Sequence, residues 1–191
     1  KNILNNKEGK VILANFSYLF LLQIAGYLFP LLTMPYLARV IGADGFGRIA
    51  IASAVIMWIQ TISDWGFNYT ATRDVAKNRD DKDKVSRILS NVLWAKFILL
   101  FFSFVILFLL IYFVPIFHEN YLVILITSLM VPGHILFPDW FFQALERMKY
   151  ITILNLLSKL LFTIAIFVFI KDKSDYIYQP LFVSLGFILS G

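Results

Sequence analysis

The chain has 191 residues, of which 60% are hydrophobic and 17% aromatic, whereas only 15% are charged. This balance excludes an ordinary soluble domain and indicates an integral membrane protein. The formal net charge is +5, and the absence of cysteine excludes disulfide frameworks, thiolate metal sites and cysteine nucleophiles.

Apolar stretches of about the length that crosses a bilayer recur along the whole chain. They predict an all-α integral membrane protein, a single lobe (residues 1–191) of about six transmembrane helices. The expected spans are residues 11–38, 49–69, 90–114, 121–142, 150–170 and 176–191, the last still apolar where the chain ends.

Glycine and proline punctuate these spans. Gly42, Gly45 and Gly47 predict a tight turn between the first two spans rather than a phosphate cradle, because no strand precedes them. Prolines inside helices remove ladder hydrogen bonds and favour kinks, which suits a transporter that moves between two openings. These prolines are Pro30 and Pro35 in the first span and Pro132 and Pro138, with Gly133, in the fourth.

The lysines and arginines between the spans lie mostly on one side of the predicted helices. The tail before the first span carries three lysines, and the loops after the second and fourth spans carry the remaining basic residues of that side. The distribution of basic residues therefore places the N-terminus and the long basic loop in the cytoplasm. We interpret the basic loop as this topology signal beside acidic lipid headgroups, and we expect no nucleic-acid partner.

Two spans carry polar residues in a stripe at helical spacing. In the second span the stripe is Ser53, Gln60, Asp64 and Asn68, and in the fifth it is Thr152, Asn155, Lys159 and Thr163. Lipid cannot satisfy such groups, so the stripes should face protein or water. They fit either interhelical hydrogen bonds or a ligand-lined cavity.

Lys159 lies near the centre of the otherwise uncharged residues 150–170, with no acidic residue expected at its depth in these spans. A cation there costs about 2.5 to 3.5 kcal/mol on insertion scales and marks a candidate functional site. By contrast, Asp64, Lys96 and Asp139 fall near the cytoplasmic ends of their spans. A structural salt bridge of Lys96 with either aspartate is the favoured interpretation, and ion coupling is the alternative.

No catalytic constellation emerges from the sequence. His118 and His134 lack the spacing of a metalloprotease motif, and His134 is expected to be packed and hydrogen-bonded. There is no phosphate-binding loop and no nucleophile elbow. We therefore expect no enzyme activity, no metal and no cofactor.

Three segments together resemble a known family. The segments are Met34–Gly47 (MPYLARVIGADGFG), Asp64–Val75 (DWGFNYTATRDV) and Pro138–Tyr150 (PDWFFQALERMKY). They look like the corresponding segments of bacterial polysaccharide flippases of the Wzx type. These O-antigen transporters belong to the superfamily that includes the multidrug MATE exporters. One departure is Ala144, where the family pattern has glycine.

The resemblance implies an N-terminal lobe of a flippase with about twelve helices, whose C-terminal lobe is absent from this chain. Such a protein would move undecaprenyl-pyrophosphate-linked O-antigen repeat units across the bacterial inner membrane by alternating access, for lipopolysaccharide or surface polysaccharide biosynthesis. The implied partners are this lipid-linked oligosaccharide, the bilayer and other polysaccharide assembly proteins.

The chemistry of this substrate indicates which residues of the chain could bind it. A cationic, polar-lined cavity would replace the hydration of the pyrophosphate and sugar. The substrate-binding candidates are Lys159, Asn155, Thr163 and Thr152 in the cavity, Arg39 and Arg48 at the outer mouth, and Lys96 near the inner one. Asp64 and Asp139 are the candidates for proton or sodium coupling.

Two other classes of protein remain as alternatives. A MATE-like exporter of small cations would favour an acidic cavity, and a membrane glycosyltransferase or polymerase would carry a large outer loop or an acidic catalytic cluster.

Overall fold

The computed structural model describes residues 7–190, and the side chains of residues 9–189. Every regular element in this part of the chain is helical. The long helices are α1 (Lys7–Val40), α2 (Gly42–Asp64), α4 (Lys82–Phe113), α9 (Met148–Phe169) and α10 (Tyr178–Ser190). Between them lie α3 (Phe67–Lys77), α5 (Pro115–Glu119), α6 (Tyr121–Ser128), α7 (Met130–Leu136), α8 (Asp139–Ala144) and the 3-10 helix η2 (Lys173–Ile177).

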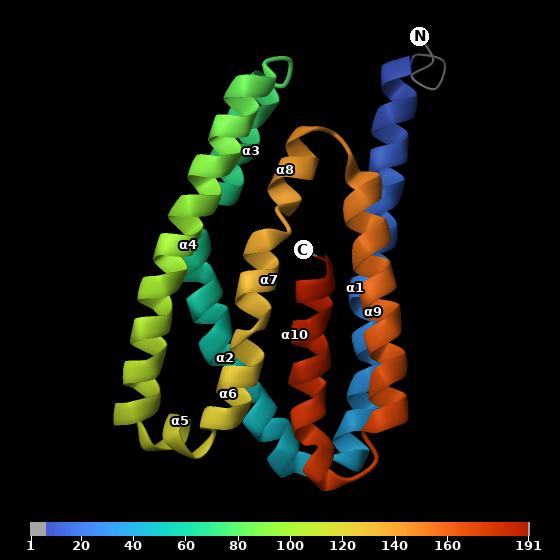
Figure 1. Ribbon diagram of the computed structural model, residues 1–191. Helices are drawn as coiled ribbons and strands as arrows, with labels where there is room; N and C mark the ends of the chain where they lie inside the picture. Colours follow the sequence, from blue (N-terminus) through green and yellow to red (C-terminus); the bar gives the residue numbers. More distant parts are fainter. Residues whose placement is uncertain (1–6, 191) are drawn as a thin grey trace.

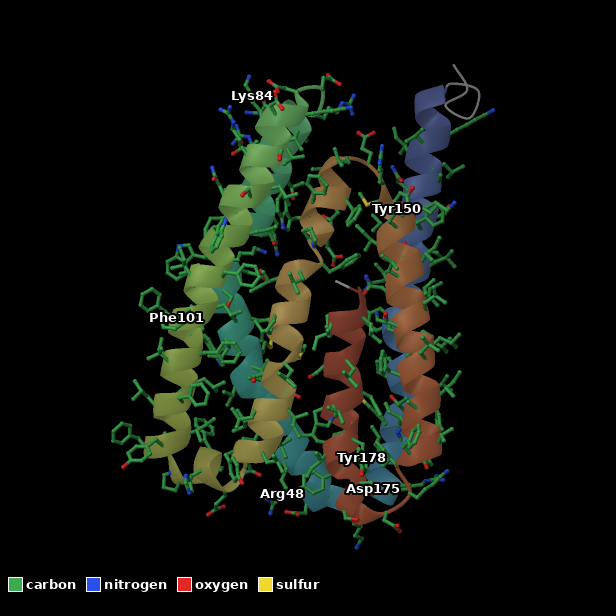
Figure 2. All side chains as sticks on the ribbon, in the orientation of Figure 1. Arg48, Lys84, Phe101, Tyr150, Asp175 and Tyr178 are labelled. Carbon is green, nitrogen blue, oxygen red and sulfur yellow. The ribbon has the colours of Figure 1, made fainter. Side chains whose placement is uncertain are left out.

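Five helical segments are long and apolar enough to cross a membrane. They are Gly9–Val40, Gly42–Lys77, Lys82–Phe113, Tyr121–Ala144 and Met148–Phe169. Their outward faces carry large apolar side chains, among them Phe101, which is 66% exposed and projects away from α4 (Figure 2). The predicted all-α membrane fold is confirmed, and each segment overlaps one of the first five predicted ranges.

The predicted glycine turn between the first two spans is shorter than expected. Gly42 has a φ of +71°, in the left-handed region that favours glycine, so the turn is confined to Ile41 and Gly42. Gly45 and Gly47 instead lie inside α2, which corrects the prediction. A methyl group at Gly45 would lie 3.1 Å from Cβ of Tyr176, so the lack of a side chain at Gly45 permits close packing against η2.

Backbone breaks divide two of the spans. After α2, Trp65 and Gly66 adopt left-handed conformations, with φ of 39° and 77°, and α3 then begins at Phe67. The fourth span is divided at Leu129 and again at Phe137 and Pro138, which gives α6, α7 and α8. The prolines of α1 have no such effect, because the helix continues through both of them.

The helices form a bundle in which α10 occupies a central position (Figure 1). It packs against α6, α7 and α9, while α1 lies along α9 and α2 packs against α4 and α6. The N-terminal end of α1, the turn between α3 and α4, and α8 lie at one end of the bundle. The C-terminal end of α4, together with α5 and η2, lies at the other end. We call the first of these the α3/α8 end and the second the α5/η2 end.

Burial is uneven between the spans. In the most apolar window of α1 only 6% of residues are buried, whereas the share is 44% in Tyr121–Ala144. The main apolar cluster lies between α2, α4, α6 and α7 and includes Ile56, Leu107 and Ile124, all at most 1% exposed. The interior of the bundle is therefore built around α2 and the broken span, and α1 packs mainly against α9.

Candidate functional site

A cavity of about 520 Å³ lies between α1, α2, α9 and α10. The volume falls within the range of small-molecule sites, about 300 to 1,000 Å³. Its wall is mostly apolar, with Phe29, Phe46 and Phe162 from three different helices. A few polar side chains interrupt this wall: Thr33, Ser53, Asn155, Ser158, Lys159, Thr163 and Gln179.

The fifth-span stripe supplies the charged part of this cavity. Helix α9 contains neither glycine nor proline, so its ladder runs unbroken and keeps Asn155, Lys159 and Thr163 in register on one face. Thr152, the fourth member, does not line the cavity. Its buried hydroxyl donates to the carbonyl oxygen of Tyr18 at 3.0 Å, which ties α9 to α1. The stripe therefore combines one interhelical contact with three cavity residues.

Lys159 lies halfway along α9, and its ammonium group reaches α1. A methyl group built at Gly26 would lie 3.8 Å from Nζ of Lys159, so the lysine lies over the glycine. Among the described residues, Lys159 makes no hydrogen bond and no ion pair within 4.0 Å. Its half-buried ammonium therefore keeps its donors available to whatever enters the cavity.

Asp139 lies closer to Lys159 than the sequence predicted. It interacts electrostatically with Lys159, although no ion pair joins them. The sequence did not predict this interaction, because the chain breaks at Phe137 and Pro138 and the α8 that follows packs against both α3 and α9. The Asp139 carboxylate offsets part of the cationic charge of Lys159 without occupying its donors.

A second lysine, Lys96 of α4, lies in an entirely different environment. It is 2% exposed, and its Nζ donates at 2.8 Å to both Asp64 and Asn68. His134 approaches the same carboxylate, with Nε2 3.6 Å from Oδ2 of Asp64, and its ring packs edge-on against Phe187. This cluster, which we call the Lys96 cluster, joins α2, α3, α4 and α7. Lys96 lines neither of the two cavities described here.

The predicted salt bridge of Lys96 is confirmed with Asp64, at 2.8 Å, and does not include Asp139. Among the described residues Asp139 has no ion pair within 4.0 Å, and its Oδ1 is buried without a hydrogen-bond partner. Lys96 reaches Asp64 instead, because α2 packs directly against α4, whereas α8 packs on α3. Asp139 nevertheless interacts electrostatically with His134 and Lys96 as well as with Lys159. It is thus the acidic group between the two lysine environments.

The two arginines predicted at the outer mouth lie at the α5/η2 end, where Figure 2 labels both Arg48 and Asp175, whereas Lys84 lies at the α3/α8 end. Arg48 pairs with Asp44 at 3.1 Å and donates to Asn120 at 3.3 Å. Arg39 is exposed in the last turn of α1. Neither arginine lines the cavity, so the structure does not bring them together with Lys159.

Two short caps order the loops around this framework. At the α5/η2 end, the carboxylate of Asp175 accepts hydrogen bonds from the backbone N–H groups of Lys171 and Asp172, which lower its pKa. At the α3/α8 end, the backbone N–H of Lys84 likewise lowers the pKa of Asp81, the N-cap of α4. Both residues are partly exposed at the surface, so their contribution is local.

Sequence reasoning missed three polar residues of the cavity, Thr33, Ser158 and Gln179. Gln179 is the one amide in residues 176–191, and that isolation was the signal that could have found it. Gln179 also lines a second cavity of about 240 Å³, together with Ser53, Gln60 and Thr127. Within the described residues, no group of three or more His, Cys, Asp or Glu side chains could hold a metal ion.

Comparison with known proteins supplies an independent line of evidence. Residues 12–191 match the family described as "Polysaccharide biosynthesis protein". The chain is 35% identical over 161 residues to a protein of Escherichia coli (strain K12), covering 84% of this chain and 39% of that protein. It is 29% identical over 177 residues to a protein of Shigella dysenteriae, covering 93% of this chain and 44% of that protein.

Both relatives are provisionally named O-antigen transporter. The chain spans about two fifths of the length of these curated relatives. No solved structure matches the chain with significance.

Proposed function

Since this chain belongs to the polysaccharide biosynthesis protein family, we propose that it forms one lobe of a flippase for lipid-linked polysaccharide precursors. The substrate would be an undecaprenyl-pyrophosphate-linked O-antigen repeat unit, and the curated relatives named as O-antigen transporters support this assignment. The membrane would be the bacterial inner membrane, with the N-terminus in the cytoplasm, as the basic residues of the loops suggest.

The observation that carries the proposal is the unpaired ammonium group of Lys159 in the 520 Å³ cavity. A pyrophosphate loses its hydration when it enters an apolar barrier, and a charge-assisted hydrogen bond from an ammonium offsets part of that cost. Asn155 and Thr163 lie one turn to either side of Lys159 on the same face of α9. They supply neutral hydrogen-bonding groups beside the cation. The apolar polyprenyl tail would remain in lipid.

The transport cycle we propose is alternating access between this lobe and a second one. The breaks at Leu129 and at Phe137–Pro138 offer positions at which the fourth span can bend. Asp139, which lies between Lys159 and the Lys96 cluster, is the carboxylate best placed to couple a proton or sodium ion to substrate binding. Asp64 already balances Lys96, so a change in its charge would disturb the packing of α2 on α4.

The test replaces Lys159 by Ala and by Arg in the full-length protein and measures surface O-antigen in a flippase-null strain. We expect display to fall at least about tenfold in the Ala variant, which loses the cation. The matched control is Lys149→Ala, because Lys149 is an exposed lysine in the first turn of the same helix, outside the cavity. Normal display by Lys159→Ala at a matched protein level would contradict a required contact.

A further inference from the structure

The second cavity adjoins the first one. It lies between α2, α6, α7 and α10, and its volume is about 240 Å³. Ser53, Gln179 and Val183 line both cavities, so the two spaces meet at these side chains. A ligand that fills the first cavity from Lys159 to Gln179 would therefore reach the second cavity.

The polar groups of the second cavity are uncharged and mostly without partners. The amides of Gln60 and Gln179 and the hydroxyl of Ser53 make no hydrogen bond with any described residue. The Thr127 hydroxyl donates to the Val123 carbonyl oxygen at 2.7 Å, which leaves its own lone pairs to accept. Each amide offers two donors and one acceptor. Such groups recognise a ligand that both donates and accepts hydrogen bonds and carries no charge of its own.

The rest of the cavity wall is aliphatic. Ile56, Met57, Met130 and Pro180 provide this surface, and methionine adapts readily to irregular shapes. A sugar ring presents hydroxyl groups around its edge and C–H groups on its faces, and so complements a wall that mixes amides with aliphatic side chains. A phosphate would find no cation here, because every residue that lines this cavity is uncharged.

The volume limits what can enter. About 30 Å³ is the share of one water in the liquid, so about 240 Å³ corresponds to roughly eight waters. This space suits one monosaccharide rather than a chain of them. Further sugars would extend into the larger cavity.

We propose that the second cavity is a carbohydrate subsite, which binds the sugar nearest the pyrophosphate while Lys159 binds the pyrophosphate itself. The inference rests on the proposed flippase function and divides that site into an ionic part and a neutral part. Gln179, whose side chain lines both cavities, stands at the boundary between them. Gln60 and Thr127 belong to the neutral part alone.

The experiment compares two probes on the purified full-length protein. One is a polyprenyl pyrophosphate without sugar, and the other is the same lipid carrying one sugar. The wild-type protein should bind the sugar-bearing lipid more tightly. Gln60→Leu keeps the approximate size of the side chain but removes the amide, and should lower affinity for the sugar-bearing lipid about tenfold. Affinity for the sugar-free lipid should stay unchanged.

Two further variants complete the design. Gln179→Leu makes the same change on α10, at the boundary of the two parts, and should lower affinity for the sugar-bearing lipid more than affinity for the sugar-free lipid. This second variant guards against a folding defect peculiar to one variant. Gln23→Leu is the matched control, because Gln23 is exposed on α1, lines neither cavity and bonds only to Tyr27 of its own helix. It should bind both lipids as the wild-type protein does.

The possible outcomes distinguish a failure of the carbohydrate subsite from a failure of the proposed flippase function. Equal affinity of the wild-type protein for both lipids, or undiminished binding of the sugar-bearing lipid by the Gln60 and Gln179 variants, would overturn the subsite and leave the flippase proposal standing. An equal loss for both lipids in both variants would also overturn it. If the wild-type protein bound neither lipid, the proposed function would fail and the subsite with it.

Discussion

Lys96 and Lys159 are both lysines inside apolar spans, yet they differ in burial and in the partners that the fold gives them. Lys96 is 2% exposed and donates to Asp64 and Asn68, so three helical segments share one satisfied charge. Lys159 is half-buried beside a cavity and has no such partner among the described residues. The comparison shows that a charge in a span does not by itself mark a ligand site. What distinguishes the two is whether the fold already supplies the counter-charge.

The largest difference is expected when each lysine is replaced by Met. Lys96→Met leaves Asp64 without its main partner, and losing one member of a buried pair costs about 3 to 5 kcal/mol of the free energy of unfolding. Lys159→Met removes an unpaired ammonium, so it should cost less than about 1 kcal/mol or stabilise the protein. Thermal unfolding of the full-length protein in detergent, followed by tryptophan fluorescence, measures both. Similar losses of stability in the two variants would contradict the view that only Lys96 is paired within the fold.

The second prediction concerns the glycines beside the two lysine environments. A methyl group at Gly133, next to His134, would lie 2.6 Å from the backbone of Phe187 and Ile188, so Gly133→Ala must push α7 away from α10. Overpacking of this kind costs about 1 to 3 kcal/mol, more than the helix propensity that alanine gains.

Gly26→Ala is the matched variant beside Lys159. Its methyl group would lie at an ordinary 3.8 Å from Nζ, so the substitution should be neutral or slightly stabilising. The same unfolding assay measures both variants. A Gly133→Ala protein as stable as Gly26→Ala would mean that α7 and α10 pack less closely than the structure has them.

A smaller effect is expected at the end of the Lys159 cavity. The hydroxyl of Tyr36 donates at 2.6 Å to the carbonyl oxygen of Ile170, which holds α1 against the end of α9. Tyr36→Phe should lower the free energy of unfolding by about 1 kcal/mol, the typical net value of one hydrogen bond. Tyr112→Phe is the control, since Tyr112 is 76% exposed on α4 and has no hydrogen bond with a described residue. Equal stability of the two variants would argue against this tie.

The smallest effect is a pH dependence at η2, remote from both lysines. Because the folded-state pKa of Asp175 is lowered, its cap stabilises the protein above the unfolded-state pKa near 3.8. That stabilisation is lost as the pH falls through the folded-state value. Asp175→Asn should therefore lower the unfolding temperature slightly at neutral pH, and the difference should shrink below about pH 4. A difference in unfolding temperature that grew at low pH would contradict a stabilising role for the ionised Asp175 carboxylate.

Hydropathy was sufficient to predict the five membrane-crossing segments, because burial in lipid depends on composition over about twenty residues. Helical spacing likewise placed Asn155, Lys159 and Thr163 on one face, and the structure lines the cavity with all three. Information of this kind lies within a single segment. It can be read without knowing which helices become neighbours.

The parts that sequence reasoning missed depend on contacts between helices. Thr152 belongs to the same stripe, but its hydroxyl meets Tyr18 because α1 lies along α9 at that height. Gly45 fits against Tyr176, more than a hundred residues later, and no local pattern distinguishes this packing from a turn. The electrostatic interaction of Asp139 with Lys159 depends on the chain break at Phe137 and Pro138. None of these distances can be derived from the period of a helix.

The order in which the helices are synthesised gives the sparse burial of α1 a consequence for folding. Its main neighbour, α9, begins about 110 residues after α1 ends. At about 5 to 20 residues per second, α1 would wait roughly 5 to 20 seconds for that neighbour. During this interval it must remain stable in the bilayer with few contacts besides those with α2, which its long uncharged sequence permits. The cavity around Lys159 thus acquires its walls late, and α10 is the last of them to be made.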